Sequence, residues 1–261
     1  MNRRDFLGAA ASTLIAGPRL FETGGDQLQP IGLQLSTVHD TFTRDPEGTL
    51  AAVAAVGYRD VELYELYGPR GWDAKRLRAA LDRTGLVARA VHVPTSLLYR
   101  GLERHAAVAA SLGCTYIVCS HIDPDERRAV RDWHELAAVF NRAGETARRA
   151  GGGLRVAYHN HDYELASVDR QVPYDILLAE TDPSLAWFEL DARLGNPSAY
   201  LAAHRGRFFA LHVGGEQVDP RLLAAARGAL VERYFVEIND PPSPSIDSAR
   251  RAYVALRQMR W

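Results

Sequence analysis

The feature of this 261-residue sequence that most restricts its fold is an alternation of strand-like and helix-like segments, repeated eight times. The strand-like segments are rich in β-branched and aromatic residues, and they cover residues 31–36, 60–65, 87–93, 115–120, 154–159, 186–191, 208–213 and 234–238. Each is followed by apolar residues at three- and four-residue spacing, and several of these segments close on a glycine, the expected helix stop. Strand and helix alternating at intervals of roughly 20 to 40 residues predict a (β/α)₈ barrel.

A doubly wound open sheet is the alternative that the same alternation permits. Its dinucleotide-binding form carries Gly-x-Gly-x-x-Gly after the first strand, whereas residues 36–48 of this chain read STVHDTFTRDPEG. The length also suits a barrel, because such barrels commonly form one domain of ~250 residues. We therefore predict a single-domain (β/α)₈ TIM barrel over residues 28–261.

Residues 1–27 differ from the rest of the chain. Arg3 and Arg4 precede an apolar run over residues 6–16, which is much shorter than the ~20 residues of a membrane helix. The segment RRDFL resembles the core of a twin-arginine export signal. This resemblance implies a signal peptide, the twin-arginine export machinery as a partner, a periplasmic location, and no stable membrane insertion after the signal is removed. The alternative is an amphipathic start that stays attached.

Charge and cysteine content limit the possible partners. Lys and Arg total 31 against 32 for Asp and Glu, so the formal net charge is −1. Without a basic excess or a long block of one sign, nucleic acid is not an expected partner. Cys114 and Cys119 lie five positions apart in one apolar run. If that run is a strand, the two thiols point to opposite faces and cannot form a disulfide.

Polar residues gather where the predicted strands end, which is where barrels of this kind carry their active sites. They are Glu62 and Glu65, His92, His121, His159 and His161, Asp191 and Arg193, His212, and Glu237 and Asn239. Because side chains alternate along a strand, Glu189 shares a face with Asp191, while Leu190 turns outward. Each residue alone is equally well explained as an ion pair or a packed ring. Four successive strand ends with metal-ligand side chains, from the fifth to the eighth, favour a site.

The chemistry of these side chains is consistent with one divalent metal ion. Carboxylates combined with imidazoles form a mixed oxygen and nitrogen site, which suits Mn, Zn, Co or Fe better than a purely oxygen site does; Mg is also retained. Such an ion binds two neighbouring oxygens of a sugar and acts as a Lewis acid. A flanking carboxylate can then remove the proton between a carbonyl and a hydroxyl group, which produces an enediolate.

Seven motifs in order, IGLQLSTVHD, GYRDVELYELYG, AVHVP, YHNHDYE, FELD, LHV and YFVEI, fall between residues 31 and 238. Together they resemble the sugar phosphate isomerase/epimerase family, the xylose isomerase-like barrels. The resemblance implies a TIM barrel in which strands five to eight supply Glu, Asp, His and Glu to one divalent ion. Asp191, His212 and Glu237 match the last three positions. His159 stands where the epimerases have Glu, in the HNHD form found in one branch of the family.

The resemblance and the strand ends together give each residue an expected role. The predicted metal ligands are His159, Asp191, His212 and Glu237; the predicted catalytic residues are Glu237, His159 and His161; the predicted substrate-binding residues are Glu62, His92, His121 and Arg193. Asp162 is expected to point away from the site, and Glu164 is expected to lie in a loop. After the seventh strand the chain reads HVGGE where relatives often carry a lysine, which suggests an altered substrate site.

Three functions remain open at this stage. The first is a metal-dependent isomerase or epimerase that acts on a sugar or keto-sugar through an enediolate. The second is a lyase or dehydratase that acts on a keto-sugar or inosose with the same metal site, and the third is a non-catalytic sugar-binding barrel. No glycine-rich anion cradle precedes a helix in the sequence, which favours an unphosphorylated substrate. The near-neutral charge argues against the DNA-cleaving endonuclease relatives of this family.

Overall fold

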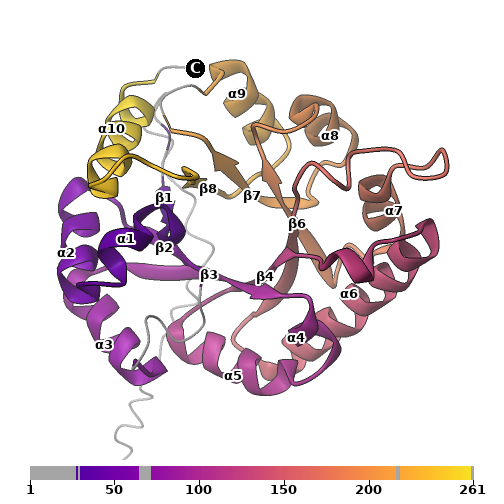
Figure 1. The fold of residues 1–261 in the computed structure, drawn as a ribbon, viewed down its shortest axis with the longest axis horizontal. Coiled ribbons are helices and arrows are strands. Elements are labelled where there is room, and N and C mark those ends of the chain that lie inside the picture. Colours follow the sequence, from indigo (N-terminus) through magenta and orange to yellow (C-terminus); the bar gives the residue numbers. More distant parts are fainter. Residues whose placement is uncertain (1–27, 29, 65–71, 216–217, 260–261) are drawn as a thin grey trace, which may run out of the picture.

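The computed structural model describes residue 28 and residues 30–64, 72–215 and 218–259 of the chain. In these residues eight parallel strands form a closed barrel, and β8 pairs with β1. The strands are β1 (Ile31–Gln34), β2 (Asp60–Leu63), β3 (Val87–Pro94), β4 (Tyr116–His121), β5 (Arg155–His159), β6 (Ala186–Asp191), β7 (Phe208–Val213) and β8 (Arg233–Val236). Figure 1 looks down the barrel and shows the strands around its centre with the helices outside them. The predicted (β/α)₈ barrel is confirmed.

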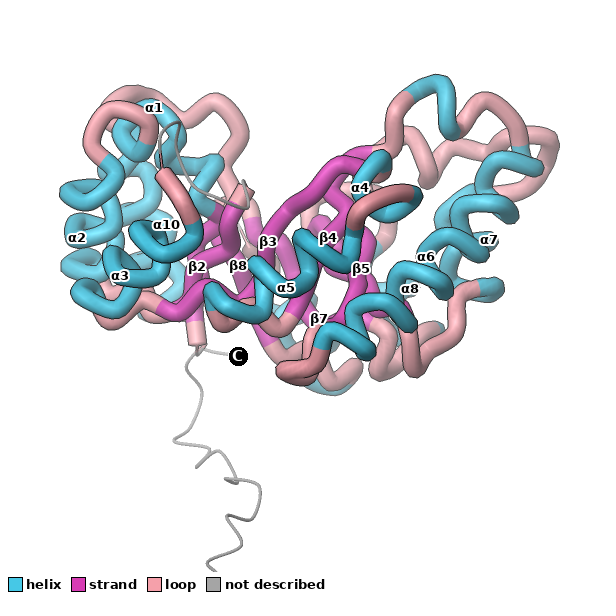
Figure 2. The backbone as a smooth tube through the Cα atoms, turned by 90° about the horizontal axis from the view of Figure 1, so that it is seen from below, coloured by secondary structure: helices cyan, strands magenta, loops and turns pink. Residues whose placement is uncertain are grey.

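Helices form the outer layer, and the side view in Figure 2 shows them around the inclined strands. They are η1 (Leu35–Val38), α1 (His39–Phe42), α2 (Pro46–Val56), α3 (Ala74–Thr84), α4 (Ser96–Tyr99), α5 (Leu102–Leu112), η2 (Pro124–Glu126), α6 (Val130–Ala150), α7 (Pro173–Glu180), α8 (Pro197–Ala203), α9 (Pro220–Gly228) and α10 (Ser245–Gln258). The sequence explains their limits. Asp73 accepts a hydrogen bond from the amide of Arg76 and so caps the start of α3. Gly85, in the left-handed conformation with φ 69°, ends the same helix as predicted.

Two predictions lie partly or wholly outside the described residues. Residues 1–27, to which the export signal was assigned, are not described, and neither is Glu65. In the described part of the chain, no helix combines the length and the apolar character needed to cross a membrane. The strand predicted over residues 31–36 is shorter than expected, because β1 ends at Gln34 and the chain continues directly as η1.

The lower part of the barrel interior is apolar. It is filled by Ala90, Tyr116, Val118, Ala157, Phe209, Ala210 and Phe235. Phe235 occupies space that a side chain on β1 would otherwise fill, since a Cβ added to Gly32 would lie 2.4 Å from its ring. These residues precede the polar residues of their strands, and in a parallel barrel earlier positions lie nearer the amino end. The polar residues are therefore confined to the carboxyl end, above an apolar floor.

Strand alternation sends the polar side chains inward, as predicted. Leu190 belongs to the core between the barrel and its helices, whereas Glu189 and Asp191 on either side of it face the interior. The pairing of β6 with β7 shifts by one residue between Phe188 and Glu189. Cys114 and Cys119 are both buried and free, in agreement with the expectation that they do not pair.

Candidate metal centre and pocket

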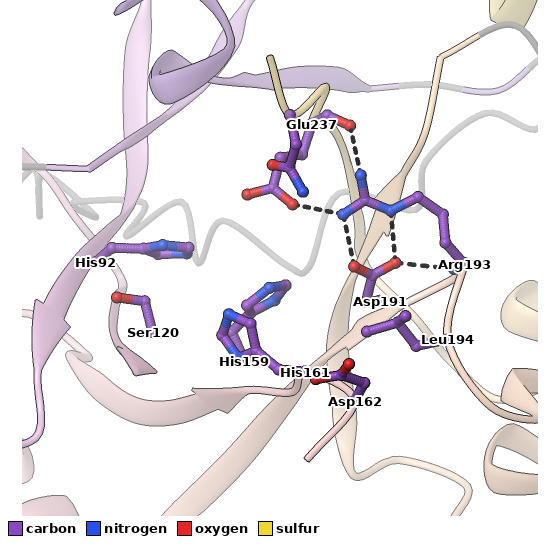
Figure 3. Close-up of a pocket in the computed structure, with 10 residues that line it drawn as sticks. His92, Ser120, His159, His161, Asp162, Asp191, Arg193, Leu194 and Glu237 are labelled. Atoms are coloured by element: carbon purple, nitrogen blue, oxygen red, sulfur yellow. Dashed lines mark hydrogen bonds and ion pairs between the residues drawn. The ribbon is translucent and has the colours of Figure 1, made fainter. Parts of the chain in front are cut away.

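The carboxyl end of the barrel holds a cavity of about 480 Å³. Strand ends and the loops that follow them line it (Figure 3), with His92, Ser120, His159, His161, Asp162, Asp191, Arg193, Leu194, Glu237 and Asn239. Most of the residues that the sequence singles out lie in this lining. Of the others, Glu62 and His212 lie beneath the cavity, and His121 lies outside it. A site at the carboxyl end is the arrangement expected of this fold.

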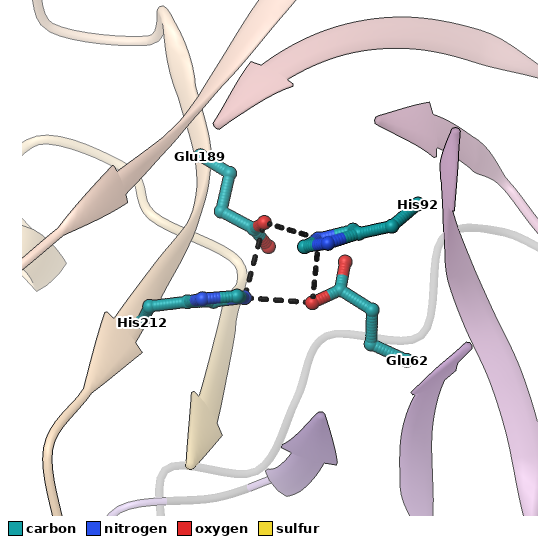
Figure 4. Close-up of side chains that lie close together, drawn as sticks. All are labelled: Glu62, His92, Glu189 and His212. Carbon is teal, nitrogen blue, oxygen red and sulfur yellow. Dashed lines mark hydrogen bonds and ion pairs between the residues drawn. The ribbon is translucent and has the colours of Figure 1, made fainter. Parts of the chain in front are cut away.

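Four polar side chains meet across the barrel beneath the cavity, and we call them the interior set: Glu62, His92, Glu189 and His212 (Figure 4). The Nε2 atom of His212 lies 2.6 Å from Glu62 Oε2 and 3.0 Å from Glu189 Oε2. The Nε2 atom of His92 lies 3.2 Å and 3.1 Å from the same two oxygens. Two nitrogens and two oxygens therefore alternate around one point, and all four side chains are buried.

Burial and opposite charge act against each other in the interior set. Burial alone lowers the pKa of His92, but the carboxylates of Glu62 and Glu189 outweigh it and raise that pKa to about 10. The same competition raises the pKa of His212 well above its ordinary value. Burial alone raises the pKa of Glu189, but His212, His159 and His92 hold it well below its usual range. Each buried charge in the set is stabilised by an opposite charge beside it.

A second group, which we call the pocket set, consists of His159, His212 and Glu237. Each offers a ligand atom, and the three atoms lie within 4.8 Å of one another. His212 uses its other ring nitrogen here, since Nδ1 lies 3.3 Å from Glu237 Oε2. Burial raises the pKa of Glu237, but His212 and His159 outweigh it and hold that pKa well below its usual range. Glu237 is therefore an ionised carboxylate at neutral pH.

Asp191 is engaged by an arginine rather than by the pocket set. Arg193 donates from Nε to Asp191 Oδ1 at 2.8 Å and from Nη2 to Asp191 Oδ2 at 2.5 Å. The same Nη2 lies 2.7 Å from Glu237 Oε2 (Figure 3). Arg193 was predicted to bind substrate, but in the structure its guanidinium joins two of the four predicted metal ligands. Sequence reasoning missed this ion pair, because β6 ends at Asp191 and Arg193 lies in the turn that follows, where strand alternation gives no information.

The HNHDYE segment after β5 places its residues in different surroundings. His161 lines the cavity, and burial together with His159 and His121 lowers its pKa to about 4. It is therefore a neutral imidazole at physiological pH. Asp162 also lines the cavity, which corrects the expectation that it points away. That expectation assumed a continued strand, but β5 ends at His159, so strand alternation no longer applies beyond it.

Glu164 lies in the turn after β5, as expected of a loop residue, but it is fully buried, which the sequence did not predict. Its Oε1 accepts hydrogen bonds from the amide of His161 at 2.5 Å and from the hydroxyl of Tyr158 at 2.9 Å. Burial raises the pKa of Glu164 to about 7. The carboxylate therefore shapes the turn that carries His161 and Asp162.

Other residues of this turn connect neighbouring strands. Asn160 is buried, and its side-chain oxygen accepts a hydrogen bond from the amide of Asp191 at 2.8 Å. The hydroxyl of Tyr163 accepts one from the amide of Ile122, and its ring stacks on His161 with centroids 5.3 Å apart. These contacts fix the end of β5 against β4 and β6, so the turn is a rigid wall of the cavity.

His121 does not reach the cavity. Its side chain is 49% exposed and pairs with Asp123 at 3.7 Å. Sequence reasoning also gave Glu189 no role, although its place two residues before Asp191 on the same strand face was the available signal. Ser120 and Leu194 line the cavity as well, and neither carried a chemical signal in the sequence.

Both sets have the donors that a divalent ion requires. Imidazole nitrogens combined with carboxylate oxygens suit Zn²⁺, Mn²⁺, Co²⁺ or Fe²⁺. Several buried nitrogen and oxygen atoms that could bind a metal have no hydrogen-bond partner among the described residues, namely Glu62 Oε1, His159 Nδ1, Glu189 Oε1 and His212 Nδ1. Unsatisfied buried donors and acceptors are costly, and an ion would satisfy them. The residues present therefore fit a metal ion.

Comparison with solved structures supports the fold. A sugar phosphate isomerase/epimerase from Parabacteroides distasonis superposes with a TM-score of 0.76 at 21% identity, over 88% of this chain and 97% of that chain. An AP endonuclease of family 2 from Brucella melitensis gives 0.65 at 14% identity, over 86% and 96%. D-psicose 3-epimerase from Clostridium cellulolyticum gives 0.64 at 12% identity, over 87% and 96%.

The family resemblance seen in the sequence thus reappears in three dimensions, because proteins described as sugar phosphate isomerase/epimerase and as xylose isomerase domain proteins share this fold. No protein-family model matches the sequence, and no curated protein matches it. At these identities the likeness shows a common fold alone, and activity has to be argued from the site.

Proposed function

We propose that the chain is a metal-dependent isomerase or epimerase, which removes a proton from the carbon beside the carbonyl of a sugar or keto-sugar. An isomerase returns the proton to the neighbouring carbon, and an epimerase returns it to the opposite face of the same carbon. The observation that carries the proposal is the pocket set, an ionised carboxylate and two imidazoles gathered at the carboxyl end of the barrel beside a cavity of about 480 Å³. Barrels with the same fold include structures described as a sugar phosphate isomerase/epimerase and as a D-psicose 3-epimerase, which supports sugars as the substrate class.

Glu237 is the proposed base. Its carboxylate lines the cavity and is ionised at neutral pH, so an oxygen lone pair is available to accept a proton. Removing the proton from the carbon between a carbonyl and a hydroxyl group gives an enediolate of the sugar. The guanidinium of Arg193, bonded to Glu237 at 2.7 Å, orients the carboxylate.

His161 is the proposed second proton carrier. It belongs to the loop after β5, three strands away from β8, so it approaches the cavity from a different side than Glu237 does. Its Nδ1 is buried without a hydrogen-bond partner among the described residues. A neutral imidazole can take up a proton from the substrate or pass one on, which would replace the second carboxylate of the epimerases.

His159, His212 and Glu237 would hold the divalent ion of this site, and Asp191 would join them if Arg193 released one of its oxygens. A bound ion would supply Lewis acidity to neighbouring oxygens of the sugar. The identity of the ion stays open among Mn, Zn, Co, Fe and Mg.

The charges around the cavity favour a neutral substrate. Of the described lining residues, Arg193 alone is a lysine or arginine. Its positive charge is already paired with Asp191 and Glu237. Asp162 adds a further carboxylate to the lining. Among the described lining residues, a phosphate group would find no cationic side chain that is not already paired, which supports an unphosphorylated sugar.

A lyase or dehydratase is the second candidate, and one observation favours it. The second proton carrier is an imidazole rather than a carboxylate. An imidazole that has accepted the proton from the substrate carbon can pass that proton to a departing hydroxyl or alkoxyl group. The same enediolate would then lose a group from the next carbon. If neither reaction occurs, the remaining hypothesis is a barrel that binds a sugar without catalysing a reaction.

The experiment that separates these functions is product analysis by NMR after incubation with keto-sugars that do or do not carry a β-leaving group. The metal-reconstituted protein should interconvert sugars of equal mass. An unsaturated product from the β-substituted sugar alone would instead assign the lyase. No product from either class would contradict both enzymatic assignments.

A further inference from the structure

The interior set has the geometry of a metal site in its own right. When four ligand atoms lie about 2.1 Å from one ion, the distance between neighbouring ligand atoms is about 3.0 Å in a square arrangement and about 3.4 Å in a tetrahedral one. The four neighbouring nitrogen–oxygen distances in the interior set are 2.6, 3.0, 3.1 and 3.2 Å. Their atoms therefore need little movement to surround one ion (Figure 4).

The surroundings of the interior set support a bound cation. Glu62 and Glu189 are both fully buried, and each faces the imidazoles with its Oε2 atom. The Oε1 atom of each has no hydrogen-bond partner among the described residues, so each carboxylate has a second oxygen available to an ion. Gln34 donates to Glu62 Oε2 at 3.0 Å and so holds that carboxylate from outside the set. A hydrogen bond that orients a ligand from behind is a regular feature of protein metal sites.

His212 belongs to both the interior set and the pocket set, and it contributes a different ring nitrogen to each. Its Nε2 faces Glu62 and Glu189, while its Nδ1 faces Glu237 at 3.3 Å. The two groups therefore use different nitrogens of one ring and do not compete for the same donor atom. Glu62, Glu189 and His212 do not line the cavity, so an ion held by them lies below its floor.

We propose that Glu62, His92, Glu189 and His212 bind a divalent cation of their own, beneath and in addition to the ion assigned to the pocket. Two imidazole nitrogens with two carboxylate oxygens match Zn²⁺ best. Formal charges also balance with both ions present. The carboxylates of Glu62, Glu189, Asp191 and Glu237, together with a bridging imidazolate at His212, offset two divalent ions and Arg193.

The interior ion is structural. It joins β2, β3, β6 and β7 across the barrel, and through His92 it fixes the floor of the cavity. The alternative explanation of the same short distances is a network of imidazolium–carboxylate ion pairs without an ion. The two explanations differ in how many ions the folded chain retains.

The test is a count of Zn²⁺ retained by the folded full-length protein after chelation, zinc loading and dialysis. Wild type should retain about two equivalents. Glu62→Leu, which removes an interior ligand, and Glu237→Ala, which removes a pocket ligand, should each retain about one, and His212→Ala should retain none. Glu164→Gln is the matched control, because it alters an equally buried glutamate outside both sets and should retain about two.

Each outcome of this count is decisive. Wild type that retains one equivalent, lost in Glu237→Ala and kept in Glu62→Leu, overturns the interior ion and leaves the pocket site intact. One equivalent lost in Glu62→Leu and kept in Glu237→Ala supports the interior ion and removes the pocket ion instead. If Glu62→Leu does not fold, Co²⁺ loading of Glu237→Ala decides. Strong visible absorption of four-coordinate cobalt supports the interior site, and its absence overturns it.

Discussion

Glu164 stands in a polar segment of the sequence, yet in the folded chain its carboxylate is enclosed and accepts hydrogen bonds from Tyr158 and His161. Periodicity could not predict this, because the turn that buries Glu164 begins where β5 ends. Its partners come from the strand before it and from the turn itself. The polar character of this segment therefore did not show whether Glu164 is exposed to solvent or buried beneath the turn.

Glu164 gives the first prediction at the residue scale. Its pKa rises from 4.5 to about 7 on folding, so the folded state binds a proton more tightly than the unfolded state. The stability it contributes is present below pH 4.5 and is lost as the pH rises through 7. Glu164→Gln should remove this dependence. Relative to the variant, wild type should lose on the order of 3 kcal/mol of unfolding free energy between pH 4 and pH 8.

Denaturant unfolding at a series of pH values measures this difference. Parallel pH profiles of wild type and variant would show that the pKa of Glu164 is the same in the folded and the unfolded chain. That result would contradict the burial argument.

A second residue-scale prediction concerns the pocket. Asp191→Ala should lose the pocket ion and activity together, and His212→Ala should lose activity together with both ions. Glu237→Gln should keep part of the metal, because an amide oxygen still coordinates, and should lower turnover by about 10²–10⁴-fold, because an amide is no base at neutral pH. His161→Ala should have an intermediate effect, because it should reduce turnover more than it reduces metal content.

Metal analysis and turnover measured on the same preparations test these variants. Glu145→Gln on the exposed surface of α6 is the control and should change neither quantity. Full turnover in Glu237→Gln would remove Glu237 as the base.

At the element scale, the sequence predicted the strands and their polar ends well, because alternation and helix periodicity are local properties. It did not predict side-chain partners across the barrel. His159, His212 and Glu237 were expected to converge, and the structure brings a ligand atom of each within 4.8 Å of the others, although their roles stay predictions. Arg193 holds Asp191 through a local rotamer choice that no pattern encodes.

Gly32 on β1 gives a prediction about the element it belongs to. A Cβ at this position would meet the ring of Phe235 at 2.4 Å inside the closed barrel. Gly32→Ala should therefore destabilise the protein by about 1–3 kcal/mol through overpacking. Gly228→Ala in α9 is the matched control, because a Cβ there meets nothing within 4 Å, and it should be neutral or slightly stabilising.

Thermal and denaturant unfolding of both variants measure the effect. Equal stability of Gly32→Ala and wild type would mean that the ring of Phe235 can move to make room for the added Cβ. The apolar packing beneath the site would then be less rigid than we infer.

At the scale of the whole molecule, the number of strands and the barrel topology followed from the sequence, whereas export concerns residues outside the described part. We predict that Arg3 and Arg4 direct the chain through the twin-arginine route, because paired arginines before a weakly apolar run are typical of that signal. Replacing both with Lys should retain the precursor in the cytoplasm. Cell fractionation measures this, and unchanged export would refute the signal assignment.

The central claim is that this barrel uses a bound metal ion and Glu237 to move a proton on a sugar carbon. The most direct measurement is solvent deuterium incorporation into recovered keto-sugars, followed by NMR in D₂O with the metal-loaded protein. The account predicts deuterium at one carbon beside the carbonyl, lost after chelation and lost in Glu237→Gln. A metal-loaded wild-type protein that introduces no deuterium into any sugar of the panel would contradict the account and leave a sugar-binding barrel without turnover.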